Sequence, residues 1–597
     1  MEKFEERGGG GDETGNRGRH GSWDRVREWS HDRWGEPLEV EDLLPYYLTV
    51  GEGATGPPQR PSASELRVLG GGEDEIQIHE LTLANGMQVS YKCTDFCDDE
   101  VLFSGTAHGG RTELSPDRAP SALMAVTVAE ELGIFGVKPS KAMDMLTGKR
   151  VSLGLSIEAY DREASGSCAA ADLEAALQLL HLLFVAELRW DEGRLETVLS
   201  YVEEHVRNQN KDPQERLMSL INQVNTQGHP FYAPPSLALL AKVDPLWAAA
   251  YFKSQFRNPA AFRFVFIGTL DPAEVVPLLH KYLGSIPVPA PVPSSNSGGR
   301  TGTAADEGGA AVGGSLGEHD RGPSVVRPWE EPIRTRTGVN PLDVRFPPNK
   351  VTKVIRVPMG DPYAVSIITF PVALGGPRHP SHAERLRDNI LIQFAASVLE
   401  TRLNEVLRFT LGRTYGVSVQ DSFASAPPMI QPDQPLPGTV MITLSCEPQE
   451  LPLLRATTLS EIKRLQDSGP REDEIKGAVE ADRRDRETAE RTNAYWLHTL
   501  SMQYQSPRYE GDVDKTYMQL VACRSEVRAS LSPETLREAY VHFFGDLQRR
   551  TEVSLLPQQR WKSAGRFTAL GALAAGVLAA GAMAVARSRS AAPRTIR

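Results

Sequence analysis

A stretch with few large apolar side chains divides this chain into two parts that repeat one order of predicted elements. Residues 289–348 start out rich in Pro, Ser, Gly and Ala and offer too little apolar surface for a core, so we predict a flexible linker. The chain has 597 residues, more than one hydrophobic core usually serves. The sequence therefore predicts two folded units of similar plan, over 75–288 and 349–558.

The first unit opens with a predicted β-hairpin. Apolar residues alternate up to Leu83 and again from Met87, and Asn85-Gly86 between them is a strong hairpin-turn signal. Near its end the strand FRFVFIG (262–268) leads to a helix that starts at Asp271, an N-cap residue followed by Pro. Between these elements we predict strands from 101, over 151–158 and over 164–170, and helices over 119–132, 141–149, 171–187 and 192–209.

The second unit repeats this mixture of strands and helices. We predict strands over 365–372, 414–421, 439–446 and 551–556, and helices over 382–408, 451–467 and 471–503. Two α+β units in tandem are therefore expected on either side of the linker.

The two ends of the chain differ from the units. Residues 1–74 are charged, rich in Gly and without a secretory signal, so they are predicted to be disordered. The tail, 559–597, contains twenty uncharged residues over 567–586, enough to span a bilayer, and four arginines follow them. We predict a tail anchor, with the units in the cytosol or facing an organelle's outer surface. The alternative is an Ala-rich helix that does not enter a membrane.

Composition excludes some classes of function. The formal charge of −12 argues against a general nucleic-acid binder. The cysteines are few and odd in number, which is typical of a reducing compartment rather than a disulfide framework. They are Cys93, Cys97, Cys168, Cys446 and Cys523.

The candidate site lies in LETRLNEVLRFTLGRTYGVSVQ, residues 399–420, where helical spacing gives way to a turn and then to alternation. Arg408 closes the predicted helix and Tyr415 lies just inside the strand. A guanidinium and a phenol are donors suited to the carbonyl oxygens of an extended peptide. The structural alternative is a helix-end cation and a core aromatic residue.

Several stretches together resemble the pitrilysin/insulinase family of zinc proteases, and most of all the carboxy-terminal half of PQQL-like members. They are LTLANGMQVSYKCTDF, DDEVLFSGTAHGG, FVFIGTLDP, LRFTLGRTYGVSV and NAYWLHTL. The resemblance implies two tandem homologous α/β-sandwich domains of the pitrilysin and mitochondrial-processing-peptidase type. It also implies that Arg408 and Tyr415 hold the peptide substrate.

Active members of that family carry His-x-x-Glu-His, in which two imidazoles bind zinc and the Glu activates water. This motif is absent, and 127–131 (TVAEE) stands where the resemblance would place it, with Thr127 and Glu131 at the histidine positions. The chain alone is therefore expected to have no catalytic residues, no metal ligands and no zinc of its own. Zinc is expected on a pitrilysin-type catalytic half, either a separate subunit or a part that this gene model lacks. The alternative function is a structural or assembly subunit of a membrane complex.

Overall fold

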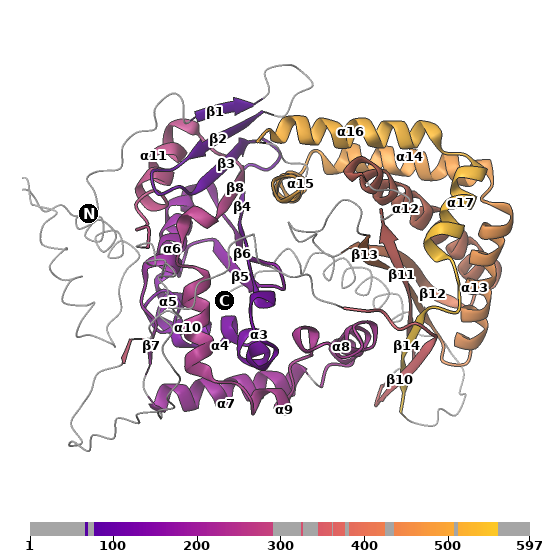
Figure 1. Ribbon diagram of the computed structural model, residues 1–597, viewed down its shortest axis with the longest axis horizontal. Coiled ribbons are helices and arrows are strands. Elements are labelled where there is room, and N and C mark those ends of the chain that lie inside the picture. The colour runs from indigo at the N-terminus through magenta and orange to yellow at the C-terminus, as the bar shows by residue number, and fades with distance from the viewer. Residues whose placement is uncertain are drawn as a thin grey trace, which may run out of the picture.

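The computed structural model describes residues 66–69, 77–190, 192–209, 211–289, 324–325, 344–360, 362–375, 381–423, 435–506 and 511–558. These residues form two large β-sheets, each covered by helices (Figure 1). The fold is therefore mixed in α and β content, as predicted.

The first sheet has seven strands in the order β1-β2-β3-β8-β4-β6-β5. The predicted hairpin is confirmed: β2 and β3 are antiparallel, and Gly86 in the turn has a φ of 82°, which favours glycine. Among the strand pairs described in this sheet, β3 and β8 alone are parallel. The strands are β1 (Leu66–Leu69), β2 (Ile78–Thr82), β3 (Gln88–Cys93), β4 (Val101–His108), β5 (Val151–Ile157), β6 (Asp161–Cys168) and β8 (Arg263–Gly268).

Helices cover one face of this sheet and enclose the larger core. The Asp271 side chain caps the last of them as expected, since it accepts from the Ala273 amide over 2.8 Å. The helices of the first unit, of which α8 lies away from this core, are α3 (Ala119–Leu123), α4 (Ala125–Leu132), α5 (Pro139–Met145), α6 (Leu173–Val185), α7 (Glu192–Gln209), α8 (Pro213–Asn225), α9 (Leu237–Leu240), α10 (Pro245–Gln255) and α11 (Pro272–Tyr282).

The second sheet has five strands in the order β10-β14-β11-β13-β12, of which β10 and β14 are parallel. The first strand of the unit was not predicted, because its partner β14 lies far along the chain: Val351 pairs with Thr551. The strands are β10 (Val351–Val357), β11 (Ala364–Leu374), β12 (Thr414–Phe423), β13 (Leu436–Cys446) and β14 (Thr551–Pro557).

The helices of the second unit differ from the prediction: the helices Val513–Ser530 and Pro533–Phe544 were not predicted, and one predicted helix is divided. The single helix predicted over 471–503 is two helices, because the Thr492 side chain accepts from the Tyr495 amide over 3.3 Å and starts a new helix. The helices are α12 (His382–Leu403), α13 (Leu451–Ser468), α14 (Glu472–Ala489), α15 (Asn493–Gln505), α16 (Val513–Ser530) and α17 (Pro533–Phe544).

Each unit contributes a helix to the other unit's sheet. Leu500 and Tyr504 of α15 pack with Ile78, Val265 and Ile267 of the seven-stranded sheet. In return, α8 packs on the five-stranded sheet, beside β10 and β14 (Figure 1). The contacts of α8 are made by Leu217 and Ile221 with Ile355, Val357, Val365, Ile367, Val553 and Leu555. The two units are therefore joined by reciprocal apolar contacts.

Two short strands lie inside segments predicted to lack structure. β1 pairs with β2 although it lies within 1–74, and β9 (Ser324–Val325) pairs with β7 (Arg189–Trp190) although it lies within 289–348. Backbone pairing to an existing strand needs little apolar sequence of its own, so composition does not indicate it. The rest of 1–74, most of the linker and the tail with 567–586 lie outside the described residues. In the part of the chain that the structure describes, no helix combines the length and apolar content needed to cross a membrane.

Candidate functional site

Arg408 lies on an irregular turn at the end of α12. Regular α-helix ends at Leu403, and a π-helix over Asn404–Thr410 continues it. The Leu411 amide donates to the Val406 carbonyl over 3.0 Å, five residues back rather than four. Such wide turns are rare and occur frequently at functional sites.

Tyr415 lies in a β-bulge at the start of β12. Thr414 is paired with Cys446 and Gly416 with the adjacent Ser445, so Tyr415 has no residue opposite it in β13. The Thr414 hydroxyl holds the bulge, since it donates to the Ser445 carbonyl over 2.7 Å and accepts from the Gly416 amide over 3.2 Å. Bulges re-aim a side chain and are common beside active sites.

The Tyr415 hydroxyl is available as a donor at neutral pH. The side chain is half-buried, and this burial, with the Glu447 carboxylate nearby, raises the pKa of the phenol above its usual value. The hydroxyl therefore keeps its proton.

Arg408 differs from the arginines around it. It is exposed, and within the described residues it makes no ion pair; its guanidinium carbon lies 5.7 Å from the centre of the Phe409 ring. Arg413 and Arg471 each bind a carboxylate, over 2.5 and 3.2 Å. The hydrogen-bond donors of Arg408 are consequently free to bind a ligand.

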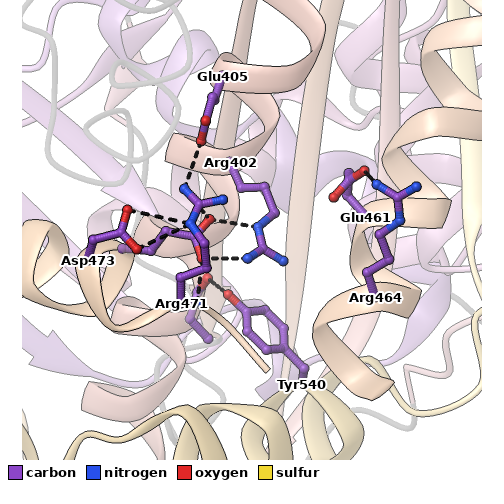
Figure 2. Close-up of polar contacts among 9 residues, drawn as sticks. Arg402, Glu405, Glu461, Arg464, Arg471, Asp473 and Tyr540 are labelled. Carbon is purple, nitrogen blue, oxygen red and sulfur yellow. Dashed lines mark hydrogen bonds and ion pairs between the residues drawn. The ribbon is translucent and has the colours of Figure 1, made fainter. Parts of the chain in front are cut away.

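One buried and two exposed ion pairs connect the π-helix region to α14. Arg402 of α12 binds Glu474 of α14 with two hydrogen bonds, one of them 2.7 Å long. Arg471, at the start of α14, binds both Glu405 of the π-helix and Asp473 over 3.2 Å (Figure 2). Arg402 and Glu474 are 8% and 6% exposed, so their pairing is shielded from water. These contacts attach both ends of the turn that precedes Arg408 to a second helix.

Side chains from the end of α12 and the start of the π-helix bind backbone groups on the outer edge of β12. The Val419 amide donates to the Glu400 carboxylate over 2.8 Å, and the Asn404 amide group donates to the Val417 carbonyl over 3.4 Å. Burial raises the pKa of Glu400. This edge of the sheet is therefore capped next to the candidate site, which is one way in which proteins protect an edge strand.

Sequence reasoning missed Glu400, Asn404 and Phe409. Two polar residues four positions apart near the end of an apolar helical stretch were a signal for the first two. In the sequence, Phe409 stood out only because the helical spacing of apolar residues breaks there.

The residues at the expected motif position do not fit a catalytic zinc site. Thr127 and Glu131 lie on α4, and neither supplies an imidazole. Nowhere among the described residues do three His, Cys, Asp or Glu side chains come together as metal ligands.

Comparison with known proteins identifies the family. The model of the peptidase M16 inactive domain matches residues 249–481, which include Arg408 and Tyr415. A zinc protease PQQL-like protein of Arabidopsis thaliana is 32% identical over 487 residues, covering 81% of this chain and 44% of that protein. The chain thus spans less than half the length of this curated relative.

Solved structures share the fold. The periplasmic protease PqqL from Escherichia coli has a TM-score of 0.57 at 13% identity, covering 88% of this chain and 49% of that one. The ferredoxin protease FusC in complex with Arabidopsis ferredoxin has a TM-score of 0.52 at 14% identity, covering 85% and 48%. At this identity the solved structures show the fold, whereas the family model and the Arabidopsis relative show that this chain belongs to the pitrilysin/insulinase (M16) family of zinc proteases and corresponds to its inactive, carboxy-terminal half.

Proposed function

We propose that this chain binds unfolded peptide substrates for a zinc-bearing catalytic half, present in cis or in trans, and that Arg408 and Tyr415 are the binding residues. The observation that carries the proposal is the state of Arg408, an exposed arginine with no ion pair among the described residues, beside arginines that all bind carboxylates. An arginine without a carboxylate partner is suited to a ligand that presents oxygen atoms.

The chemistry of the pair fits a peptide backbone. A guanidinium offers five N–H donors and a phenol one O–H donor, whereas an extended peptide presents a carbonyl oxygen at every residue. Tyr415 is held by its bulge and the turn before Arg408 by the network around Arg402, so both donors sit on supported backbone. Pre-organised donors lose little entropy when the peptide binds. The ferredoxin bound to FusC supports a protein or peptide as the class of substrate.

Binding to the full chain tests the proposal directly. The probe is a fluorescein-labelled, unstructured Ala- and Ser-rich peptide with one Phe, and the measurement is fluorescence anisotropy. Arg408→Ala should weaken binding by about tenfold to a hundredfold, because a hydrogen bond to a charged group contributes roughly 1.5–3 kcal/mol. The matched control is Arg484→Ala on α14, where the arginine side chain is 72% exposed and paired with Glu480.

Two results would count against the proposal. Equal binding by wild type, Arg408→Ala and Tyr415→Phe would remove the peptide-binding role and favour a structural subunit. Chelator-sensitive cleavage by the full chain with zinc, and with no partner, would overturn its non-catalytic part.

A further inference from the structure

Phe409 is the most exposed of the large apolar side chains that the structure describes, with 74% of its surface accessible. A single exposed phenylalanine is ordinary on a protein surface, so exposure alone would mean little. Its position is what matters, because it follows Arg408 directly and lies on the same π-helix. The Arg408 guanidinium rests near one face of the ring, 5.7 Å from its centre.

The neighbouring strand edge offers little further backbone pairing to a ligand. The Val417 carbonyl and the Val419 amide, two residues apart on the edge strand β12, already bond to Asn404 and Glu400. A parallel neighbouring strand would use this same carbonyl and amide, on either side of Ser418, for its backbone hydrogen bonds. A peptide held at Arg408 therefore cannot extend its pairing along this part of β12 without displacing both side chains. Additional affinity has to come from side-chain contacts.

The geometry of a peptide connects Arg408 to Phe409. A carbonyl and the side chain of the same residue are joined through one Cα, and the Phe409 ring centre lies 5.7 Å from the Arg408 guanidinium, so a large side chain on the residue bound by Arg408 can reach the ring. An aromatic ring and an aliphatic or aromatic side chain both lose water-exposed apolar surface when they meet.

We infer that Phe409 is a specificity-determining residue that selects peptides with a large apolar side chain, such as Phe or Leu, at the residue bound by Arg408. This inference rests on the proposed peptide-binding function and adds the class of peptide. Phe409 makes the apolar contact, while Arg408 and Tyr415 bind the backbone of any sequence.

The test compares two peptides on the full chain by fluorescence anisotropy. One is the labelled Ala- and Ser-rich peptide with a single Phe, and the other has Ser in place of that Phe. Wild type should bind the Phe peptide about tenfold more tightly, the size expected for burial of one large apolar group. Phe409→Ala should remove this preference by weakening binding of the Phe peptide more than that of the Ser peptide, whereas Phe409→Leu should keep most of it. Phe96→Ala replaces another exposed phenylalanine, 39% accessible, as the control.

The outcomes separate this inference from the proposed function. Arg408→Ala should weaken binding of both peptides by a similar factor. If Phe409→Ala retains the full preference for Phe while Arg408→Ala loses affinity, the inference is wrong and the peptide-binding function stands. If no variant at 408, 409 or 415 changes binding of either peptide, both are wrong. Equal melting temperatures of wild type and Phe409→Ala, expected for an exposed side chain, show that folding is not the cause.

Discussion

The Arg402 Nε donates to the Glu474 carboxylate over 2.7 Å, and this buried pair joins the last turn of α12 to the first turn of α14. Glu474 also accepts from the Arg471 amide over 2.7 Å, so one carboxylate caps α14 and neutralises Arg402. The pair lies directly before the π-helix that carries Arg408. This buried pair is expected to contribute to the free energy of unfolding.

Arg402→Met should destabilise the chain by up to about 3–5 kcal/mol, because it leaves the buried Glu474 charge with only the Arg471 guanidinium, 3.5 Å away and 53% exposed. Urea denaturation measures the change in the free energy of unfolding. The control is Lys463→Met, which removes a pair with Asp467 whose side chains are 59% and 58% exposed; a loss below about 1 kcal/mol is expected there. Equal losses in the two variants would contradict a special role for the buried pair.

His181 should make stability depend on pH between about 4 and 6.5. The side chain is fully buried, its Nδ1 lies 2.6 Å from the Tyr282 carbonyl, and burial lowers the pKa from 6.5 to about 4. The unfolded chain therefore binds a proton near pH 6.5 that the folded chain does not bind until about pH 4. Stability contributed by neutral His181 is complete above pH 6.5 and is lost as the pH falls to about 4.

The measurement is the melting temperature of wild type and His181→Gln across that pH window. Gln does not titrate, so the variant should lose less stability on acidification than wild type, by up to about 3 kcal/mol. His542→Gln, which replaces an exposed histidine on α17, is the control and should follow wild type. Parallel curves for wild type and His181→Gln would contradict the prediction.

Leu500→Ala should weaken the contact between the two units. Leu500 is fully buried between α15 and the seven-stranded sheet, and nearby the Tyr504 hydroxyl donates to Glu80 over 2.6 Å. Truncating a buried leucine costs about 2–5 kcal/mol. Urea denaturation and limited proteolysis should both report the loss. Leu453→Ala on α13, where the leucine is 44% exposed, should change neither.

Local signals in the sequence predicted much of this fold. Asn85-Gly86 indicated the first hairpin and Asp271 the start of α11, because turn and cap chemistry act over a few residues. Strand β10 and the apolar face of α8 were not predicted, since each packs against a partner far away in the chain. Helix α8 buries only Leu217 and Ile221, too few to give a clear helical period.

The backbone positions of the two candidate residues were predicted, but the irregular backbone around them was not. Arg408 and Tyr415 were placed at a helix end and a strand start, where they lie. The π-helix and the bulge each insert one residue, and apolar spacing is too coarse to reveal a single insertion.

The tail should be needed for membrane association. This prediction rests on the sequence alone, since 567–586 is the twenty-residue uncharged run and lies outside the described residues. Cell fractionation of the full chain and of a variant without 562–597 measures it. Carbonate-resistant membrane association of the truncated variant would show that another feature holds the chain there.

The role of Tyr415 can be separated from its packing by two substitutions. Tyr415→Phe keeps the ring and removes only the hydroxyl, so it should leave the melting temperature within a few degrees of wild type and weaken binding of both labelled peptides by about tenfold. Tyr415→Ala removes the half-buried ring as well, and it should also destabilise the second unit by about 1–3 kcal/mol, less than for a fully buried aromatic residue.

If Tyr415 has only a structural role, the two variants should rank in the opposite order. In that case Tyr415→Phe would bind both peptides as wild type does, and only Tyr415→Ala would lose affinity, in proportion to its loss of folded protein. The matched substitution is Tyr201→Phe on α7, where the tyrosine is 50% exposed and the hydroxyl can be removed at a distance from the site. Because Tyr415 lies in a bulge held by Thr414, Thr414→Val should reproduce part of the binding defect with the Tyr415 hydroxyl still present. A binding defect in Tyr415→Phe and Thr414→Val, with normal binding in Tyr201→Phe, would assign the hydroxyl and its bulged backbone to peptide binding.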